Sequence, residues 1–194
     1  MPANESEIIR QCRAGDTSGF DLLVEEHYTR VYNTALRVLG NPDSAADATQ
    51  AAFVRAFRSL DSFRGDSTFS TWLYRITVNV CLDELRNRSQ EPISLTFVGD
   101  DDEDPQERSI PDERAEPSAC VARNERQRLV QQAIGQLAAE YRVVLVLYDI
   151  NGFSYKDTAQ ILGIPVGTVK SRLNRARSAL KEVLRPHLEL FELE

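Results

Sequence analysis

The feature that most limits how this chain can fold is an acidic, proline-rich segment at residues 89–122. It holds ten acidic and two basic side chains, a net charge of −8, together with four of the chain's eight prolines. Its run from Asp100 to Asp104 contains only carboxylates, and apolar side chains are few. Such a segment cannot bury enough apolar surface to offset the entropy that ordering it would cost. We therefore expect a flexible linker that divides the 194 residues into two small domains.

The stretches on both sides of this linker favour helices, and the alternation typical of strands is scarce. Gly40 suits a helix end, and Asn41 followed by Pro42 suits the capped first turn of the next helix. Helices are expected at residues 5–14, 18–39, 42–60, 68–88, 123–137, 140–150, 154–162 and 165–185. The sequence thus predicts an all-α fold. Its parts are a helical domain at 1–88, the linker at 89–122, a second helical domain at 123–186 and an acidic tail at 187–194.

The overall net charge of −7 conceals a basic second domain. Residues 123–186 carry eleven basic and five acidic side chains, a net charge of +6. A basic block of this kind is compatible with a nucleic-acid partner even in an acidic chain. No apolar run approaches the ~18 residues that a membrane helix needs. The N-terminus also lacks the basic start and apolar core of a signal peptide, so we expect a cytoplasmic protein.

Residues typical of catalytic or metal sites are not grouped in this sequence. No glycine-rich phosphate loop occurs, and His27 and His187 have no cysteine or carboxylate at metal spacing. We expect His27 at the surface or at its boundary. The three cysteines are far apart and fit neither a disulfide framework nor a zinc motif. The sequence therefore predicts a protein that is not an enzyme and that binds no metal or cofactor.

The second domain contains the pattern of a helix-turn-helix. Ser154 and Asp157 have the spacing of a helix start, Gly163 suits a left-handed helix end, and Pro165 suits the first turn of the next helix. The longer helix after the turn has one apolar side. Its opposite side carries Lys170, Ser171, Asn174, Arg175, Ser178 and Lys181. Because cations neutralise phosphates and Asn and Arg can read base edges in the major groove, we expect this side to bind duplex DNA.

The helix expected at residues 68–88 has apolar side chains on two sides, so it should lie inside a core. The narrow remaining arc holds Trp72, Arg75 and Asn79, and the preceding loop offers Phe63 and Arg64. Aromatic faces stack on unpaired bases while cations hold the backbone, so this surface suits single-stranded nucleic acid. The alternative is that Trp72 simply belongs to the core, as tryptophan usually does.

The helix that follows Pro42 carries a third candidate surface. Asp47, Gln50 and Val54 lie at i, i+3 and i+7 and so share a face, whereas Phe53 lies on another. By themselves, Asp47 and Gln50 predict only solvated surface.

Motifs in both domains resemble the extracytoplasmic function (ECF) sigma factors of the sigma-70 family. In the first domain the resemblance is carried by Thr71-Trp72-Leu73-Tyr74-Arg75-Ile76 and Asn79. In the second domain it is carried by the segments at 136–137, 141–145, 152–155, 165–173 and 175–177. It covers most of residues 5–88 and 123–185. Ala138 departs from the family, which usually has proline after the leucine, and this leaves the helix boundary there open.

The resemblance implies sigma region two at 1–88 and region four at 123–186. It implies contacts to the minus-10 promoter element by Phe63, Arg64, Thr68, Trp72, Arg75 and Asn79. It implies contacts to the minus-35 element by Lys170, Ser171, Asn174, Arg175, Ser178 and Lys181. It implies contacts to core RNA polymerase by Asp47, Gln50, Phe53 and Val54.

The function implied is that of a sigma factor, which binds the clamp coiled coil and flap of core polymerase, recognises a two-part promoter and promotes its opening. An anti-sigma factor is the further partner expected. The alternative is a stand-alone helix-turn-helix regulator, which would bind duplex DNA without polymerase. A nuclease or deaminase using the run at 100–104 would need metal ligands at fixed spacing, and the run lacks them. Whether the linker's charge acts inside the polymerase or only keeps a spacer soluble stays open.

Overall fold

The computed structural model describes the backbone of residues 3–90 and 117–190, and side chains within 5–88 and 125–187. These residues are helical with connecting turns, and they contain no strand, which confirms the all-α prediction. The helices of the first domain are α1 (Ala3–Arg13), α2 (Phe20–Leu39), α3 (Pro42–Arg58) and α4 (Phe69–Gln90). Those of the second are α5 (Pro117–Gln136), α6 (Ala139–Leu145), α7 (Tyr155–Leu162) and α8 (Val166–Leu184).

The expected linker and tail lie largely outside the described residues. Residues 91–116, with the carboxylates of 100–104, and residues 191–194 are among those not described. Helix α5 begins at Pro117, six residues before the predicted start at 123, so the helix takes in the end of the predicted linker. A short helical turn, Arg185–Leu190, follows α8. Among the described residues, no helix is both long and apolar enough to cross a bilayer.

Helix ends follow the local signals in the sequence. Gly40 adopts φ 74° and ends α2, and the Asn41 side chain accepts a hydrogen bond from a backbone N–H in the first turn of α3. Ser154 caps α7 in the same way, and Gly163, at φ 64°, ends it. The helix boundary between α5 and α6 is present although Ala138 replaces the family's usual proline. Ala138 adopts an extended conformation (φ −56°, ψ 141°) at the start of α6.

Helix α4 is buried on two sides, as its sequence predicts. One side, with Phe69 and Leu73, packs into a cluster of α1, α2 and α3 side chains that includes Leu23. The other, with Val78 and Cys81, belongs to a second cluster. Burial raises the pKa of Cys81 to about 12, so its thiol stays protonated and unreactive at neutral pH.

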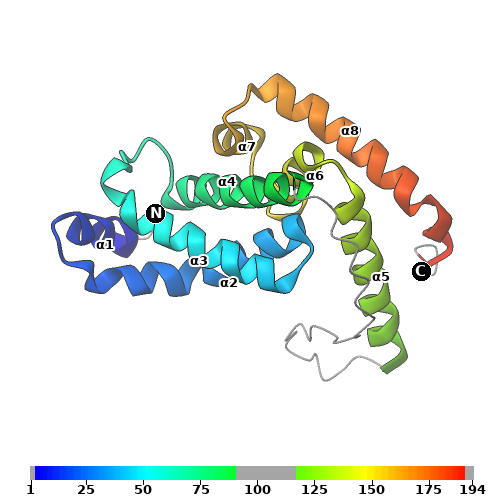
Figure 1. Cartoon of the computed structure of the whole chain (residues 1–194), viewed down its shortest axis with the longest axis horizontal. Helices are drawn as coiled ribbons and strands as arrows, with labels where there is room; N and C mark the ends of the chain where they lie inside the picture. The colour runs from blue at the N-terminus through cyan, green and yellow to red at the C-terminus, as the bar shows by residue number, and fades with distance from the viewer. Residues whose placement is uncertain (1–2, 91–116, 191–194) are drawn as a thin grey trace.

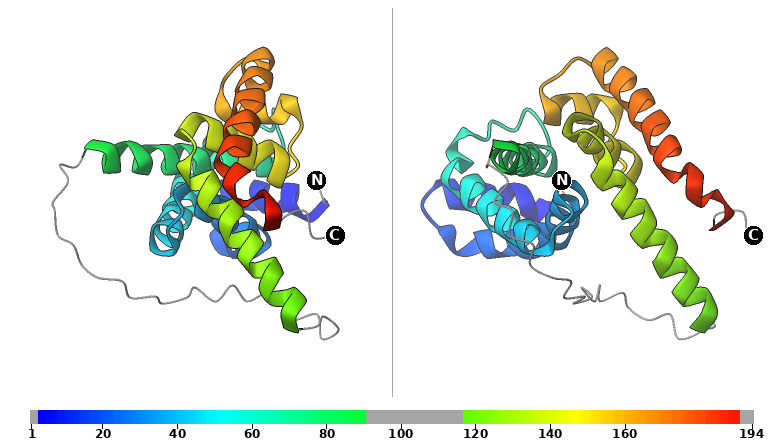
Figure 2. Two further views of the ribbon diagram at one scale, coloured as in Figure 1. Left: turned by 90° about the vertical axis from the view of Figure 1, so that its right-hand side faces the viewer. Right: turned by 45° about the vertical axis from the view of Figure 1, so that its right-hand side comes forward.

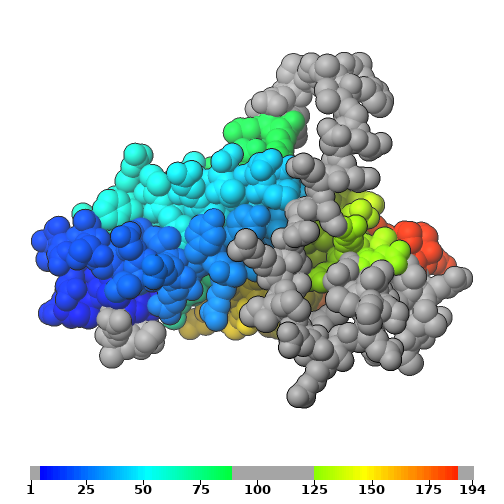
Figure 3. Space-filling model, turned by 90° about the horizontal axis from the view of Figure 1, so that it is seen from below, coloured from blue at the N-terminus to red at the C-terminus, as the bar shows by residue number. Residues whose placement is uncertain are grey.

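This second cluster joins the two domains. It unites Val38 of α2 and Val78 of α4 with Ile134 of α5 and Leu147 of the π-helical turn after α6. Figures 1 and 2 show α4 lying between the α1–α3 helices and the C-terminal helices. From below, the two domains adjoin along the long axis of the molecule (Figure 3). The domains therefore share one continuous apolar core in this arrangement.

Polar contacts surround the shared core. Asn151 donates a hydrogen bond from Nδ2 to Thr34 Oγ1 at 2.9 Å, and Gln131 Nε2 donates to the carbonyls of α2. The half-buried guanidinium of Arg142 donates to Val38 O of the first domain and to Leu137 O at the α5–α6 break. Desolvation lowers the pKa of Arg142, and these carbonyls compensate for part of that cost. The ring of Tyr74 meets that of Phe153 edge to face, with centroids 4.8 Å apart.

We predict that Phe153→Ala loosens the domain arrangement without unfolding either domain. The change removes an edge-to-face pair worth about 1 kcal/mol beyond its buried area, and this pair spans the two domains. The radius of gyration from small-angle X-ray scattering should increase. The control is Phe57→Ala, an exposed ring on α3 that packs on Phe20 away from the shared core. An unchanged radius for Phe153→Ala would show that the aromatic pair does not hold the domains together.

Candidate nucleic-acid interface

Helix α8 presents the polar face that its sequence predicts. Val169, Leu173 and Ala176 are buried at 2% exposure or less. Val169 and Leu173 pack against Val144 and Ala159, which lie on α6 and α7. The structure brings the six predicted side chains together on the exposed side: Lys170, Ser171, Asn174, Arg175, Ser178 and Lys181. The face is thus a continuous row of hydrogen-bonding groups and cations on a rigid helix, as a major-groove reader requires.

The structure separates the cations of α8 into two sets, a distinction that the sequence did not show. Arg172 forms an ion pair of 2.7 Å with Glu140, and Arg177 forms a bidentate pair with Asp149 and lies over the ring of Tyr148. The hydrogen bonds that Arg177 donates to Asp149 raise the pKa of Arg177. These two arginines therefore brace α8 against its own domain.

The second set of cations is available for an outside anion. Arg175 and Lys181 are exposed and form no ion pair with any residue in the described ranges. The ammonium of Lys170 lies 5.4 Å above the ring of Tyr155, which orients it without neutralising it. These three cations are thus the groups of α8 that can contact phosphate or base edges.

The arc on α4 is partly as predicted. Arg75 and Asn79 are exposed, and Thr68 caps the helix, since its Oγ1 accepts a hydrogen bond from Thr71 N at 3.1 Å. Trp72 is half-buried, with its ring 5.3 Å from that of Phe63. Both readings of Trp72 are therefore partly right, because one side of the indole packs on the core while the rest reaches the surface.

The expectation that Phe63 is available to an unpaired base is wrong. Its side chain is only 6% exposed and meets the Phe69 ring edge to face at 6.0 Å. The loop is a short turn, Leu60–Ser62, followed by an open bend. Burying the large apolar side chain of Phe63 in the core lowers the free energy more than leaving it in water would. Arg64, next to Gly65 at φ 79°, is the exposed side chain that the loop offers.

On α3, Asp47, Gln50 and Val54 are exposed together, as their spacing predicts. Phe53, which the resemblance adds to this set, lies on another face, as its spacing predicts: it is 7% exposed and stacks on Tyr28 with centroids 6.4 Å apart. Sequence reasoning missed that Phe57 keeps 43% of its surface exposed, beside Val54 at 41%. An exposed aromatic fits the same helical period as a core one, so the sequence held no signal to separate them.

The expectation that His27 lies at the surface or at its boundary is wrong, because the residue is buried. Its Nε2 lies 3.1 Å from Glu5 Oε1, and each of the two residues is only 5% exposed, so the contact ties α1 to α2. Glu26, which is exposed, brings a third donor atom within 4.8 Å. The chain spacing of 22 residues between Glu5 and His27 gave no indication of this contact.

Comparison with known proteins agrees with this geometry. The family model of Sigma-70 region 2 matches residues 23–91, and that of Sigma-70, region 4 matches residues 127–180. The RNA polymerase sigma-H factor of Pseudomonas aeruginosa is 35% identical over 184 residues, 95% of each chain. The ECF RNA polymerase sigma factor SigW of Bacillus subtilis is 36% identical over 177 residues, 91% of this chain and 95% of SigW.

Solved structures agree as well. The sigma factor RpoE of Bartonella quintana, determined in complex with the anti-sigma factor NepR, has a TM-score of 0.65 at 27% identity. The similarity covers 86% of this chain and 96% of RpoE. The chain therefore belongs to the ECF sigma factors of the sigma-70 family.

The corrected position of Phe63 leads to a prediction about stability. Phe63→Ala should lower the free energy of unfolding by about 3 kcal/mol, because it removes a buried ring that touches both Phe69 and Trp72. Arg64→Ala, next to it and exposed, should change stability by less than ~0.5 kcal/mol. Urea unfolding followed by circular dichroism measures both. Equal stabilities for the two variants would mean that the ring is not a core residue.

Proposed function

We propose that this chain joins core RNA polymerase in the cytoplasm, recognises a two-part promoter and promotes its opening. The observation that carries the proposal is the pairing of two different nucleic-acid surfaces in one chain. Helix α8 exposes a row suited to duplex DNA, and α4 exposes an aromatic and cationic arc suited to unpaired bases. The α4 arc lies within the Sigma-70 region 2 match, and the α8 row, apart from Lys181, lies within the Sigma-70, region 4 match.

The division of labour follows from the chemistry of each surface. Region two, proposed for residues 1–88, would hold the minus-10 element through Arg64, Thr68, Trp72, Arg75 and Asn79. Region four, proposed for residues 123–186, would bind the minus-35 element through the polar face of α8. The segment at 89–122 would connect them, with the acidic tail at 187–194 following region four. The reaction is one of binding and strand separation, so the chain needs no catalytic group.

Docking to core polymerase is proposed for the exposed face of α3. Asp47 and Gln50 supply hydrogen-bonding groups there, and Val54 supplies apolar contact. Phe53 supports this face from below rather than contacting the partner. Phe57 adds an exposed ring close to it.

We further propose that an anti-sigma factor binds this protein. It would bind the arrangement in which the two domains share one apolar core, called here the closed arrangement. The support is the shared apolar core between the domains, together with the similarity to a sigma factor solved with its anti-sigma factor. Such a partner would stabilise the closed arrangement by binding both domains at once. A stand-alone helix-turn-helix regulator is the weaker alternative, because a protein that binds only duplex DNA would not use the arc on α4 that suits unpaired bases.

Transcription in vitro tests the proposal directly. Core polymerase with this protein should start transcripts at defined sites on genomic fragments, whereas core polymerase alone should not. Specific binding of the protein alone to duplex DNA, with no effect on transcription, would instead support the stand-alone regulator.

On α8, we predict that Arg175→Ala and Lys170→Ala weaken recognition of the minus-35 element. Loss of a base contact should cost about 1–3 kcal/mol and relax specificity at one position, whereas loss of a phosphate contact should weaken all sequences alike. Footprinting of holoenzyme on matched and mismatched promoters distinguishes these effects. Arg172→Ala is the matched control, since that arginine is paired with Glu140 and should affect stability rather than specificity. Wild-type affinity and salt dependence in both test variants would remove α8 from the interface.

On α4, we predict that Asn79→Ala and Trp72→Ala slow promoter opening more than they weaken initial binding. Losing a base–aromatic stack costs about 1–3 kcal/mol. Permanganate reactivity of thymines near the start site reports opening. Asn87→Ala, an exposed asparagine two turns further along α4, is the control. Because Trp72 also contacts the core, a rescue of Trp72→Ala by a pre-melted template separates the opening defect from misfolding.

On α3, we predict that Asp47→Arg prevents association with core polymerase. Reversing a charge at a docking surface that faces a cationic partner costs several kcal/mol. Co-purification with core polymerase is the measurement, and Asp21→Arg applies the same charge change at an exposed site on α2. Retention of Asp47→Arg at the wild-type level would place the docking surface elsewhere.

A further inference from the structure

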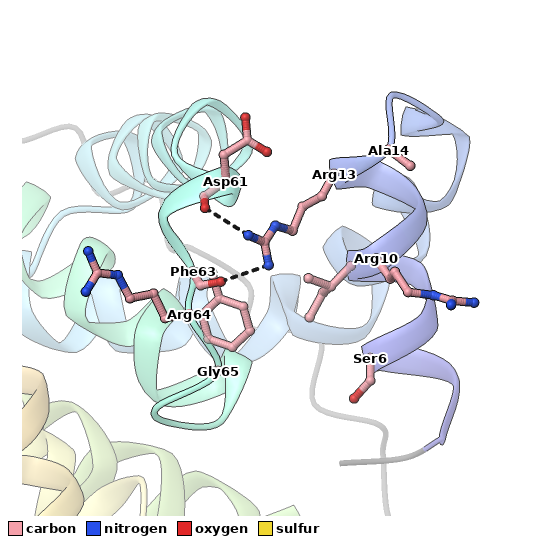
Figure 4. A pocket seen from close by; sticks show the side chains of 9 residues that line it. Ser6, Arg10, Arg13, Ala14, Asp61, Phe63, Arg64 and Gly65 are labelled. Carbon is pink, nitrogen blue, oxygen red and sulfur yellow. Dashed lines mark hydrogen bonds between the residues drawn. The ribbon is translucent and has the colours of Figure 1, made fainter.

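Besides apolar packing, helix α1 holds the loop that leads into α4 by hydrogen bonds from the side chain of Arg13. Its guanidinium crosses a groove of about 850 Å³ between α1 and this loop (Figure 4). Nη1 donates to Phe63 O and Nη2 donates to Asp61 O, each at 3.2 Å. The two carbonyls belong to a segment 48 to 50 residues further along the chain. Arg13 is therefore a two-point clamp on the loop backbone.

The clamp has a firm base, because α1 is itself anchored in the first domain. Ile8, Ile9 and Cys12 are buried in the cluster that also contains Phe63 and Phe69. The buried Glu5–His27 contact ties the start of α1 to α2. An arginine on such a helix starts from a fixed position, so its two hydrogen bonds can fix the loop in turn.

The loop has little regular structure of its own to hold it. Its first part is the short turn Leu60–Ser62, closed by hydrogen bonds to Ser59 O and Leu60 O. The residues after Phe63 form an open bend through Gly65 at φ 79°. The Asp61 and Phe63 carbonyls bonded by Arg13 lie just before the exposed Arg64, so the clamp sets where that cation is held.

The hydrogen bonds of Arg13 also affect the packing beneath Trp72. The Phe63 ring, whose backbone Arg13 holds, lies 5.3 Å from the Trp72 ring and supports its inner side. A shift of the loop would therefore displace both Arg64 and the support beneath Trp72. These are two of the groups proposed to meet unpaired bases.

We infer that Arg13 is a positioning residue for promoter opening, and that α1 serves the single-strand surface although it contacts no base itself. The inference rests on the proposed function of the α4 arc. It assigns a role to α1, which lies outside the residues matched by the region 2 family model. Arg13 acts by fixing the position of the two loop carbonyls to which it donates hydrogen bonds, and not by attracting DNA through its charge.

The test compares Arg13→Gln and Arg13→Lys with Arg10→Gln in holoenzyme. Arg10 is the matched control, because it lies one turn earlier on α1, borders the same groove and is paired with Glu7 rather than with the loop. Hydrogen exchange read by mass spectrometry should show faster exchange at residues 61–66 in Arg13→Gln but not in Arg10→Gln. Permanganate reactivity should show opening slowed about tenfold in Arg13→Gln, as expected for losing charged hydrogen bonds, with minus-35 footprints unchanged.

Arg13→Lys separates position from charge. Lysine keeps the cation but has no planar fork to span two carbonyls, so it should open promoters almost as slowly as Arg13→Gln. Wild-type opening by Arg13→Lys would overturn the inference, since charge alone would then suffice. Wild-type opening by Arg13→Gln despite a loosened loop would overturn it too. If the wild-type holoenzyme opens no promoter, the proposed function fails, whereas the exchange measurement still tests the clamp.

Discussion

Helix α4 is buried on two opposite sides, and the rest of the structure depends on this. One side completes the core of the first domain with Phe69 and Leu73, and the other joins Val78 and Cys81 to side chains of the second domain. Because both sides are occupied, only a narrow arc is left to face solvent. The residues in that arc, Arg75 and Asn79 with the edge of Trp72, are held on a helix that cannot rotate. The role that we propose for this arc, contact with unpaired bases, would benefit from this rigidity, since stacking depends on the orientation of the ring.

Arginine serves two separate purposes in this protein. Arg142, Arg172, Arg177 and Arg13 bind carbonyls or carboxylates of the chain itself and fix its turns and helices. Arg64, Arg75 and Arg175 remain exposed at the surfaces proposed for DNA. The planar fork of the guanidinium suits both uses, because it can satisfy two acceptors at once. A count of basic residues therefore overstates the charge that the protein can offer to a polyanion.

The closed arrangement connects regulation with structure. The two domains share a core that includes Val38, Ile134 and the Tyr74–Phe153 pair, so separating them exposes apolar surface. The anti-sigma factor that we propose would bind the closed arrangement without exposing this surface, whereas a partner that separated the domains would have to offset the cost of exposing it. These contacts use the buried sides of α4, next to the exposed arc that we propose for DNA, so separating the domains would alter the surroundings of that arc.

The helices, many of their ends and the helix-turn-helix were determined by the sequence, because they depend on neighbours within one or two turns; the start of α5, six residues earlier than predicted, was not. Gly40, Asn41, Ser154 and Gly163 act through their own backbone preferences and nearest hydrogen bonds. The exposed face of α8 followed from its period for the same reason.

Only the tertiary structure decided which of several equivalent apolar or polar side chains turns inward. Phe53 and Phe57 share a helix and a residue type, yet one is buried and the other is 43% exposed, because Phe53 lies in the core cluster with Leu23 and Val31, whereas Phe57 lies outside that cluster and packs on Phe20. Phe63 joins the core, His27 pairs with Glu5, and Arg13 reaches a loop some fifty residues away. These outcomes depend on contacts between distant segments, whose free energy appears only once the helices have packed.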